Sequence, residues 1–368
     1  MMNNSLITTG NNYRIKKVID KARKGENVTI AYIGGSVTEG AGASTHDKSY
    51  TYQSYLYFKD RYGKNGGDNI KYVNAGMGGT PSALGVIRYE RDVTSYGKIE
   101  PDIVLIEFSV NDYQEPTKGV AYESLIRNIL KAPNQPAVIL LFAVFKTRWN
   151  LQDNYIPTGN HYNLPMISIK DALVPELEAG RITDEEFFFD EYHPTDFGHG
   201  FMTDCIKYYF NAVDTEAISE RDIIISDIPK VGNAFEGVKM VDSKTADSNV
   251  AIITGSFTEE DCHLVSPFPN NWMHIKDKGN DSFKITLKCK NILLVTKSTS
   301  DSSYGRADVL VDGRYIKSID SSVGGGWNNA ITDLILDEDT STEHTMEIKM
   351  TQGDEDKRFS ILAIGYTQ

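Results

Sequence analysis

The sequence has few cysteines and no spacing that would make them bind a metal. Only Cys205, Cys262 and Cys289 occur among 368 residues, and none of them stands in a CxxC pair. Three thiols also cannot all be paired within one chain. The composition therefore argues against a disulfide-stapled secreted domain and favours a reducing, cytoplasmic location. Because Cys205 falls in a segment with helical periodicity, we expect it to be buried by packing.

Long apolar runs and excess positive charge are also missing. The longest run, Ala137 to Phe145, is less than half of what a bilayer span requires, and residues 1–24 lack the apolar stretch of a signal peptide. Thirty-eight Lys and Arg stand against 51 Asp and Glu, a net charge of -13. Such a field repels nucleic acid and anionic membranes. We expect neither as a partner, and a homo-oligomer is left open.

The hydrophobic pattern changes near residue 213, and the chain is long enough for two domains. Before that point, β-branched runs alternate with amphipathic segments. This pattern predicts an α/β domain in which helices cover both faces of a parallel sheet. The expected strands are 28–33, 70–74, 103–108, 138–145 and 166–169, and the expected helices are 13–24, 50–62, 82–96, 122–131 and 201–210.

Downstream of about residue 230 the helical period disappears and short alternating runs follow, at 283–287, 292–296, 308–311, 315–319 and 346–350. The pair Asp312-Gly313 between two of these runs is a strong hairpin signal. The pattern predicts an antiparallel β-sandwich of the jelly-roll type. We therefore expect an α/β domain over 1–215, a linker over 216–230 and a β-sandwich over 231–368.

Four short blocks place residues suited to catalysis at the ends of expected strands or before the last expected helix. GGSVTEG contains Ser36, NAGMGG contains Gly79, SVND contains Asn111, and DEYH contains Asp190 and His193. The carboxyl ends of parallel strands share one edge of a sheet, so these residues are expected to gather there. A hydroxyl, an imidazole and a carboxylate in that setting are the inventory of a serine hydrolase.

Each block alone has a simpler interpretation. Ser36 could cap a helix, Asn111 could be a turn residue, and Asp190 with His193 could be a surface ion pair or a metal half-site with His199. The phosphate-binding patterns GxGxxG and GxxxxGK are absent. The GxSxG elbow is not matched either, because Thr38 occupies the position of the second glycine. As a set, the blocks favour catalysis.

In this order the four blocks resemble the SGNH (GDSL-type) hydrolases over roughly the first 210 residues. The resemblance implies a three-layer αβα, flavodoxin-like domain. Ser36 would be the nucleophile, His193 the general base and Asp190 the residue that orients the imidazole. The oxyanion hole would comprise the backbone N–H groups of Ser36 and Gly79 and the amide of Asn111, with no metal and no cofactor.

Two positions depart from the usual SGNH blocks. Gly35 stands where the family usually has aspartate before the nucleophile, and Ser109 replaces the glycine of GxND. Neither change removes a reacting group. A GGS block is more similar to carbohydrate esterases than to the lipases that commonly carry the GDSL label.

The whole chain resembles the two-domain acetylesterases of gut bacteria in carbohydrate esterase family 17, in which a module similar to family 35 carbohydrate-binding modules follows the SGNH domain. The resemblance implies an O-acetylesterase with acetylated mannooligosaccharides as its substrate partner. An acetylxylan esterase and a lipase or thioesterase of the same fold remain alternatives. A non-catalytic carbohydrate-binding protein is an alternative of another class.

Aromatic side chains supply the candidate sugar contacts. Trp149 follows the fourth expected strand and should stand near the same rim as Ser36. Trp327 and Asn328 follow three glycines, and Trp327 is either sandwich core or a sugar platform. Our hypothesis is that this loop closes over the catalytic edge and holds the sugar chain. Trp272 is expected to lie in the core.

Overall fold

The computed structural model describes residues 2–245 and 249–368, and the chain divides into two compact units, Met1–Asn233 and Ala234–Gln368. The expected domain ranges, 1–215 and 231–368, include residues 1 and 246–248, which lie outside the described residues. None of the helices in the described ranges is both long and apolar enough to cross a membrane.

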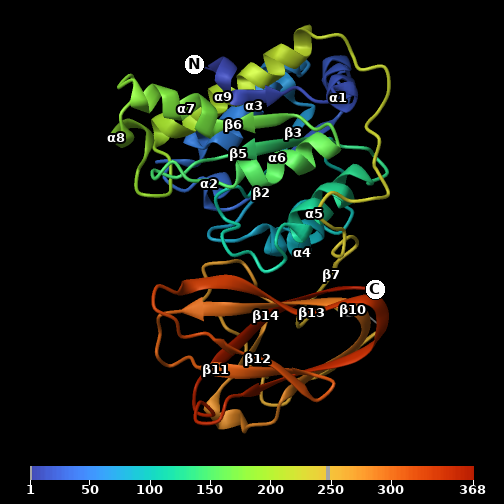
Figure 1. Ribbon diagram of the computed structural model, residues 1–368, viewed down its shortest axis with the longest axis vertical. Helices are drawn as coiled ribbons and strands as arrows, with labels where there is room; N and C mark the ends of the chain where they lie inside the picture. Colours follow the sequence, from blue (N-terminus) through green and yellow to red (C-terminus); the bar gives the residue numbers. More distant parts are fainter. Residues whose placement is uncertain (1, 246–248) are drawn as a thin grey trace. The chain divides into compact units, whose positions relative to one another are not determined.

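The first unit is built on a mixed sheet (Figure 1). Its strands are β1 (Leu6–Thr8), β2 (Val28–Gly34), β3 (Ile70–Gly76), β4 (Ile103–Glu107), β5 (Ala137–Phe142) and β6 (Met166–Ser168). They are ordered β1-β6-β5-β4-β2-β3. From β2 to β6 the pairs are parallel, as expected. The edge strand β1 is antiparallel to β6 and was not expected.

The strand order determines where a site can form. Counted along the chain, the parallel strands have the flavodoxin-like order 2-1-3-4-5, which reverses direction between β2 and β4. Connections leave these two neighbouring strands on opposite faces of the sheet, so a crevice opens beyond their carboxyl ends. Ser36 follows β2 and Asn111 follows β4. Both candidate residues therefore lie at the switch point of the sheet.

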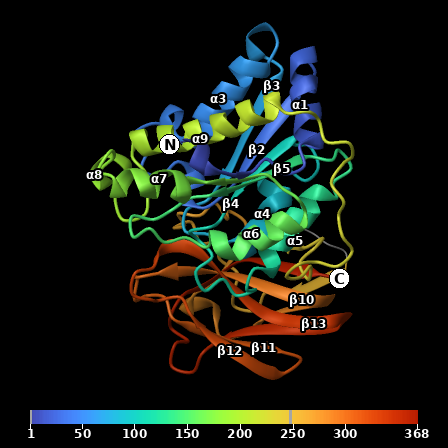
Figure 2. The same cartoon turned by 45° about the horizontal axis from the view of Figure 1, so that its top comes forward.

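Helices cover both faces of the sheet (Figure 2). On one side lie α1 (Tyr13–Lys24), α3 (Tyr50–Tyr62), α7 (Ile169–Glu178) and α9 (Asp196–Thr215), and on the other α4 (Ser82–Asp92), α5 (Val120–Leu130) and α6 (Gln152–His161). Alternate strand residues such as Ile30, Leu105 and Ile139 pack on the first layer, together with buried residues of its helices. The short helices α2 (Ser36–Glu39) and α8 (Asp184–Phe187) lie in loops.

The sequence predicted α1 and α3 with their observed bounds, but it missed α6 and α7. Each of these two helices contains a proline, Pro157 and Pro175, and proline normally interrupts a helical pattern. The apolar run Ala137 to Phe145 was expected to be strand throughout. The strand ends at Phe142, and the last three residues of the run begin the loop to α6.

The second unit is an antiparallel β domain, as predicted. Its strands are β7 (Lys239–Val241), β8 (Val250–Ile253), β9 (Trp272–His274), β10 (Phe283–Thr299), β11 (Arg306–Val311), β12 (Arg314–Asp320), β13 (Trp327–Met350) and β14 (Phe359–Thr367). The runs 283–287 and 292–296 form one strand, β10, with a register irregularity between Cys289 and Asn291. Asp312 and Gly313 have φ values of 51° and 77°, as a type I′ hairpin requires.

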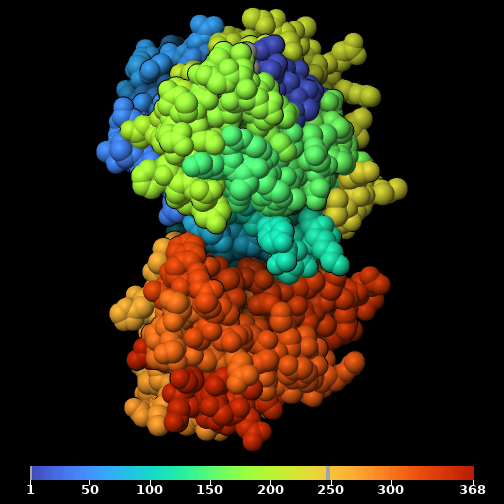
Figure 3. All heavy atoms as spheres, turned by 60° about the vertical axis from the view of Figure 1, so that its left-hand side comes forward, coloured from blue at the N-terminus to red at the C-terminus, as the bar shows by residue number. Residues whose placement is uncertain are grey.

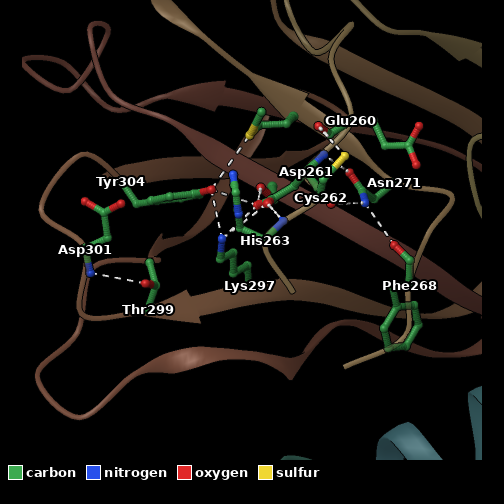
Figure 4. A network of polar contacts seen from close by, with 12 residues as sticks. Glu260, Asp261, Cys262, His263, Phe268, Asn271, Lys297, Thr299, Asp301 and Tyr304 are labelled. Atoms are coloured by element: carbon green, nitrogen blue, oxygen red, sulfur yellow. Dashed lines mark hydrogen bonds and ion pairs between the residues drawn. The ribbon is translucent and has the colours of Figure 1, made fainter. Parts of the chain in front are cut away.

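A buried polar network lies inside the second unit (Figure 4). Lys297 Nζ donates to Asp261 Oδ2 at 3.0 Å and to Tyr304 Oη at 2.8 Å. Tyr304 and Ser360 in turn donate to the same carboxylate oxygen. All four side chains are buried. Paired in this way, the buried charges avoid the large cost of desolvation without a partner.

The segment that follows α9 packs on the first unit. Arg14 Nε donates to Asp222 at 2.8 Å, and the buried carboxylate of Glu123 on α5 accepts backbone N–H groups from three successive residues, Lys230, Val231 and Gly232. The tyrosine hydroxyl of Tyr162 donates to Glu123 as well. These bonds hold Asp222 and Lys230 of the expected linker, and the two residues that follow it, against the α/β unit.

Candidate active site

The turn after β2 presents Ser36 at the edge of the sheet. The strand ends at Gly34, and Ser36 is the first residue of α2, so its backbone N–H has no partner within the helix. A Cβ atom on Gly34 would lie 2.2 Å from Thr38 Oγ1 and 2.4 Å from the Glu107 carbonyl oxygen. Only glycine fits there, because the chain passes this close to its neighbours.

The structure brings Ser36, His193 and Asp190 into one hydrogen-bonded line. His193 Nε2 lies 3.0 Å from Ser36 Oγ, and His193 Nδ1 lies 2.8 Å from Asp190 Oδ2. With its hydrogen on Nδ1 donated to the carboxylate, the imidazole presents Nε2 as an acceptor to the hydroxyl. Ser36 and His193 are 157 positions apart in the chain, yet their side chains are in direct contact.

Asp190 is held in its ionised form. Partial burial would by itself raise its pKa, but hydrogen bonds from the His193 side chain and from the backbone N–H groups of Tyr192 and His193 lower the pKa below its usual value. A carboxylate that stays charged stabilises the imidazolium that forms when His193 takes a proton. The segment between α7 and α9 that carries both residues lies at the surface of the first unit, where it is yellow-green in Figure 3.

His199 does not join this group. Its Nδ1 accepts the backbone N–H of Tyr50, so Nε2 carries the hydrogen and donates it to the Ala41 carbonyl oxygen. Burial lowers the pKa of His199 to about 4, and the ring is neutral at neutral pH. Both nitrogens are thus used in holding the loop after α2. The alternative in which His199 completes a metal half-site with Asp190 and His193 is not supported by this arrangement.

Asn111 stands directly beside the nucleophile turn. A Cβ atom on Gly35 would lie 2.0 Å from Asn111 Oδ1 and 2.7 Å from Nδ2, so the side-chain amide packs against the bare backbone next to Ser36. Its Oδ1 is buried and has no hydrogen-bond partner in the structure. The amide is therefore held by packing against the backbone that precedes the nucleophile.

Gly79 follows β3 in the loop after the neighbouring strand and has a φ of 64°. This left-handed conformation favours glycine. The loop is tied to the nucleophile turn, since the Met77 N–H donates to the Gly34 carbonyl oxygen at 3.1 Å. Buried Arg88 also donates to that carbonyl and to Ala75. These bonds fix the loop of Gly79 relative to Ser36.

Two buried carboxyl groups lie beneath the site. Burial raises the pKa of Glu107, at the end of β4, to about 7, and it raises that of Asp112 to about 7 as well. Ser109 Oγ has one hydrogen for two acceptors, Glu107 Oε1 at 3.1 Å and the Ala143 carbonyl oxygen at 3.2 Å. Ser109 thus links the loop after β4 to the loop after β5.

The three tryptophans have different environments. Trp149 is partly buried in the loop after β5, where its ring stacks on Phe145 at 5.7 Å between centroids. Trp272 is buried in the core of the second unit, as expected. Trp327 at the start of β13 is 44% exposed and does not belong to that core. Asn328 beside it has a φ of 66°.

Three aromatic residues near the site were not predicted from the sequence. Phe145 and Tyr192 contact each other at 5.1 Å between ring centroids, and Tyr113 contacts Trp149 at 5.8 Å. Each was visible in the sequence. Tyr113 follows Asn111 by two positions, Tyr192 precedes His193, and Phe145 ends the apolar run. No spacing rule indicated that they would meet.

The arrangement can perform acyl transfer. A hydroxyl hydrogen-bonded to an imidazole that a carboxylate orients is the constellation of a serine nucleophile. Within the described residues, no group of three or more His, Cys, Asp or Glu side chains is placed to hold a metal ion.

Comparisons with known proteins agree with this chemistry. The sequence model of the GDSL-like lipase/acylhydrolase family matches residues 32–201. A crystal structure of a two-domain esterase active on acetylated mannans is similar to the chain with 30% identity, covering 100% of this chain and 99% of that one, at a TM-score of 0.87. A crystal structure of such an esterase co-crystallised with mannopentaose is similar with 30% identity, 100% and 98% coverage, and a TM-score of 0.85. No curated protein matches the chain. The chain belongs to the GDSL-like lipase/acylhydrolase family and is a serine ester hydrolase.

Proposed function

We propose that the protein is an O-acetylesterase that removes acetyl groups from mannan-derived oligosaccharides through an acetyl-serine intermediate. One observation carries the proposal: the likeness to an esterase active on acetylated mannans extends over both units of the chain. The chemistry is supported by the hydrogen-bonded line of Ser36, His193 and Asp190.

In the acylation step, Ser36 Oγ attacks the carbonyl carbon of the acetyl ester while His193 Nε2 accepts the hydroxyl proton. The tetrahedral intermediate then collapses as His193 returns that proton to the departing sugar oxygen, which leaves as a free hydroxyl. Asp190 retains its charge and stabilises the imidazolium. The products of this step are the deacetylated sugar and acetyl-Ser36.

In the deacylation step, His193 takes a proton from water, whose oxygen attacks the acetyl carbon. The proton then returns to Ser36 Oγ, and acetic acid leaves and ionises to acetate. In both steps the carbonyl oxygen becomes negative. The proposed donors to it are the backbone N–H groups of Ser36 and Gly79 and the side-chain amide of Asn111. Removing one such donor typically costs about 10²- to 10³-fold in turnover.

We propose that the second unit is a carbohydrate-binding module, with Trp327 and Asn328 as sugar-binding residues. The exposure of Trp327 supports this, because an indole ring left in water is a favourable surface for the apolar face of a sugar.

The proposed reducing location rests on Cys205, Cys262 and Cys289, all of which are free thiols.

The substrate test is mass spectrometry of acetylated mannan and xylan oligosaccharides before and after treatment with the enzyme. We expect a loss of acetyl groups that is faster on the mannan fragments. Faster loss from the xylan fragments would indicate the acetylxylan esterase alternative. A p-nitrophenyl ester series should favour acetate, whereas a maximum at long acyl chains would indicate a lipase.

The catalytic test uses Ser36→Ala, with Ser302→Ala as its matched control. Ser36→Ala should lower acetate release by at least about 10⁴-fold, while mannooligosaccharide binding measured by calorimetry persists. Ser302 is an exposed serine of the second unit, and its replacement should leave turnover unchanged. Unchanged release by Ser36→Ala would refute the mechanism. Oligosaccharide binding without any acetate release by the wild type would instead leave the chain with a binding role alone.

A further inference from the structure

A row of four aromatic rings leads away from the triad. We call Tyr192, Phe145, Trp149 and Tyr113 the aromatic row. It begins beside His193, whose ring centroid lies 6.2 Å from that of Tyr192. The following centroid distances are 5.1 Å to Phe145, 5.7 Å to Trp149 and 5.8 Å to Tyr113. Tyr192 and Tyr113, its two ends, are 55% and 69% exposed.

The row is assembled from three loops that backbone hydrogen bonds hold together. The loop of Phe145 and Trp149 is closed on itself, since the Phe145 N–H donates to the Trp149 carbonyl oxygen at 3.1 Å. On one side the Lys146 N–H donates to the carbonyl oxygen of Glu191, in the loop of His193.

On the other side the Leu151 N–H donates to the carbonyl oxygen of Ser109, in the loop that carries Asn111. The ion pair between Arg148 and Asp184, at 2.7 Å, adds a third attachment of this loop to its neighbours. The rings are therefore preorganised relative to the groups proposed to perform the reaction, which reduces the entropy lost on binding.

Beyond the last ring the surface is hollowed. Tyr113 forms part of the wall of a cavity of about 310 Å³ in the first unit, whose lining includes Gln114, Lys118, Asn154 and Tyr155. These side chains carry amide, ammonium and phenol groups that can hydrogen-bond to hydroxyls. The row thus connects the triad to a cavity whose lining offers hydrogen-bonding groups beside apolar ones.

The aromatic row, followed by the cavity beyond Tyr113, matches the chemistry of a saccharide chain. Pyranose rings have apolar faces that can pack on aromatic rings, and hydroxyl edges that need hydrogen-bond partners. A long acyl chain would need a continuous apolar groove, but the lining of the cavity combines apolar side chains such as Leu151 with polar and charged ones such as Gln114 and Lys118. The occupant that fits both parts is a neutral oligosaccharide.

We propose that the aromatic row and the cavity beyond Tyr113 bind the saccharide chain of the substrate, extending from the acetylated sugar at Ser36. This inference rests on the proposed function and adds to it a binding surface of the first unit. Tyr192 and Phe145 lie nearest the reacting sugar along the row, and Tyr113 contacts a sugar further along the chain. The site therefore favours oligosaccharides over short fragments.

The test compares kcat/KM for acetylated mannooligosaccharides of increasing length with kcat/KM for p-nitrophenyl acetate. In Trp149→Ala the ratio of the two values should fall roughly 30-fold, the loss typical of an aromatic hot spot, and mainly through KM. Trp149→Phe should retain most of the ratio because it keeps an aromatic face. Tyr113→Ala should lower the ratio for long oligosaccharides and much less for short ones.

Tyr208→Ala, on an exposed position of α9, is the matched control and should leave the ratio unchanged. Melting temperatures of all variants show whether they are folded. If the wild-type enzyme releases acetate from oligosaccharides but the ratios of Trp149→Ala and Tyr113→Ala stay at the wild-type value, the row is refuted and the proposed function stands. If the wild type releases none, both are refuted. A loss confined to long-chain p-nitrophenyl esters would assign the row to an acyl chain and overturn the inference.

Discussion

Gly35→Ala is a small change that should act on catalysis through Asn111. A Cβ atom at position 35 would lie 2.0 Å from Asn111 Oδ1 and 2.4 Å from Cγ, whereas ordinary contacts begin at 3.4 Å. The amide must therefore move by roughly 1 Å or more to relieve the overlap. The φ of Gly35 is -85°, a negative value that alanine also adopts. The predicted effect is thus steric and local.

A displacement of that size is enough to break a hydrogen bond, because useful N–H···O distances span only about 2.7–3.2 Å. We expect kcat to fall about 10²-fold in Gly35→Ala and about 10²- to 10³-fold in Asn111→Ala. If the two changes remove the same interaction, their effects do not add. The double variant should then lie within about threefold of Asn111→Ala.

The assay is steady-state hydrolysis of p-nitrophenyl acetate by the single and double variants. Gly200→Ala is the matched control, since a Cβ on Gly200 in α9 would meet nothing within 4 Å. It should leave kcat unchanged and raise helix stability slightly. Fully additive effects of Gly35→Ala and Asn111→Ala would refute the reasoning, as would an unchanged kcat in a folded Gly35→Ala.

Three further predictions concern buried charges. The pKa of Glu107 is raised to about 7, so the folded protein binds more protons than the unfolded chain between about pH 4 and 7, and the stability that this group contributes is lost as the pH rises through 7. Glu107→Gln should weaken this pH dependence in urea titrations from pH 5 to 8, and equal slopes for both proteins would contradict it. Glu123→Gln directs an amide donor toward backbone N–H groups and should lower the free energy of unfolding by about 2–4 kcal/mol. Replacement of an exposed glutamate, Glu185→Gln, is its control. Equal melting temperatures for these two variants would count against the role of Glu123. Lys297→Met leaves Asp261 buried without its cation and should cost about 3–5 kcal/mol, whereas Lys297→Met with Asp261→Asn should recover part of the loss; a double variant less stable than the single one would contradict this.

The sequence predicted those helices and strands in which a single hydrophobic period extends over the whole element. The amphipathic segments 13–24 and 50–62 became α1 and α3 without shift. The prediction failed where chain-wide pairing overrides the local signal. β10 continues through the polar residues Lys288, Lys290 and Asn291 because it pairs with β13 along nearly its whole length. Such pairing partners cannot be read from a local window.

Likewise, only part of the candidate site could be predicted from the sequence. Ser36, Asn111, Asp190 and His193 could be selected because each stands in a block at a strand end or just before a helix, where parallel sheets collect functional groups. The aromatic row could not be selected, because the contacts that assemble it join three loops through backbone groups that every residue has. Side-chain identity carries no information about those bonds.

Both departures from the usual SGNH blocks contribute to the placement of Asn111 and its neighbours. Gly35 leaves the space that the amide of Asn111 fills, and an aspartate at 35 could not be accommodated without moving that amide. Ser109 supplies a hydroxyl that a glycine lacks, and this hydroxyl reaches Glu107 and the carbonyl oxygen of Ala143 at the start of the next loop. The backbone oxygen of Ser109 accepts the N–H of Leu151 at the end of that loop. One segment therefore positions both the proposed oxyanion donor and the loop of the aromatic row. Because the two depend on the same backbone, a change in the loop that alters saccharide binding is expected to alter the stabilisation of the transition state as well.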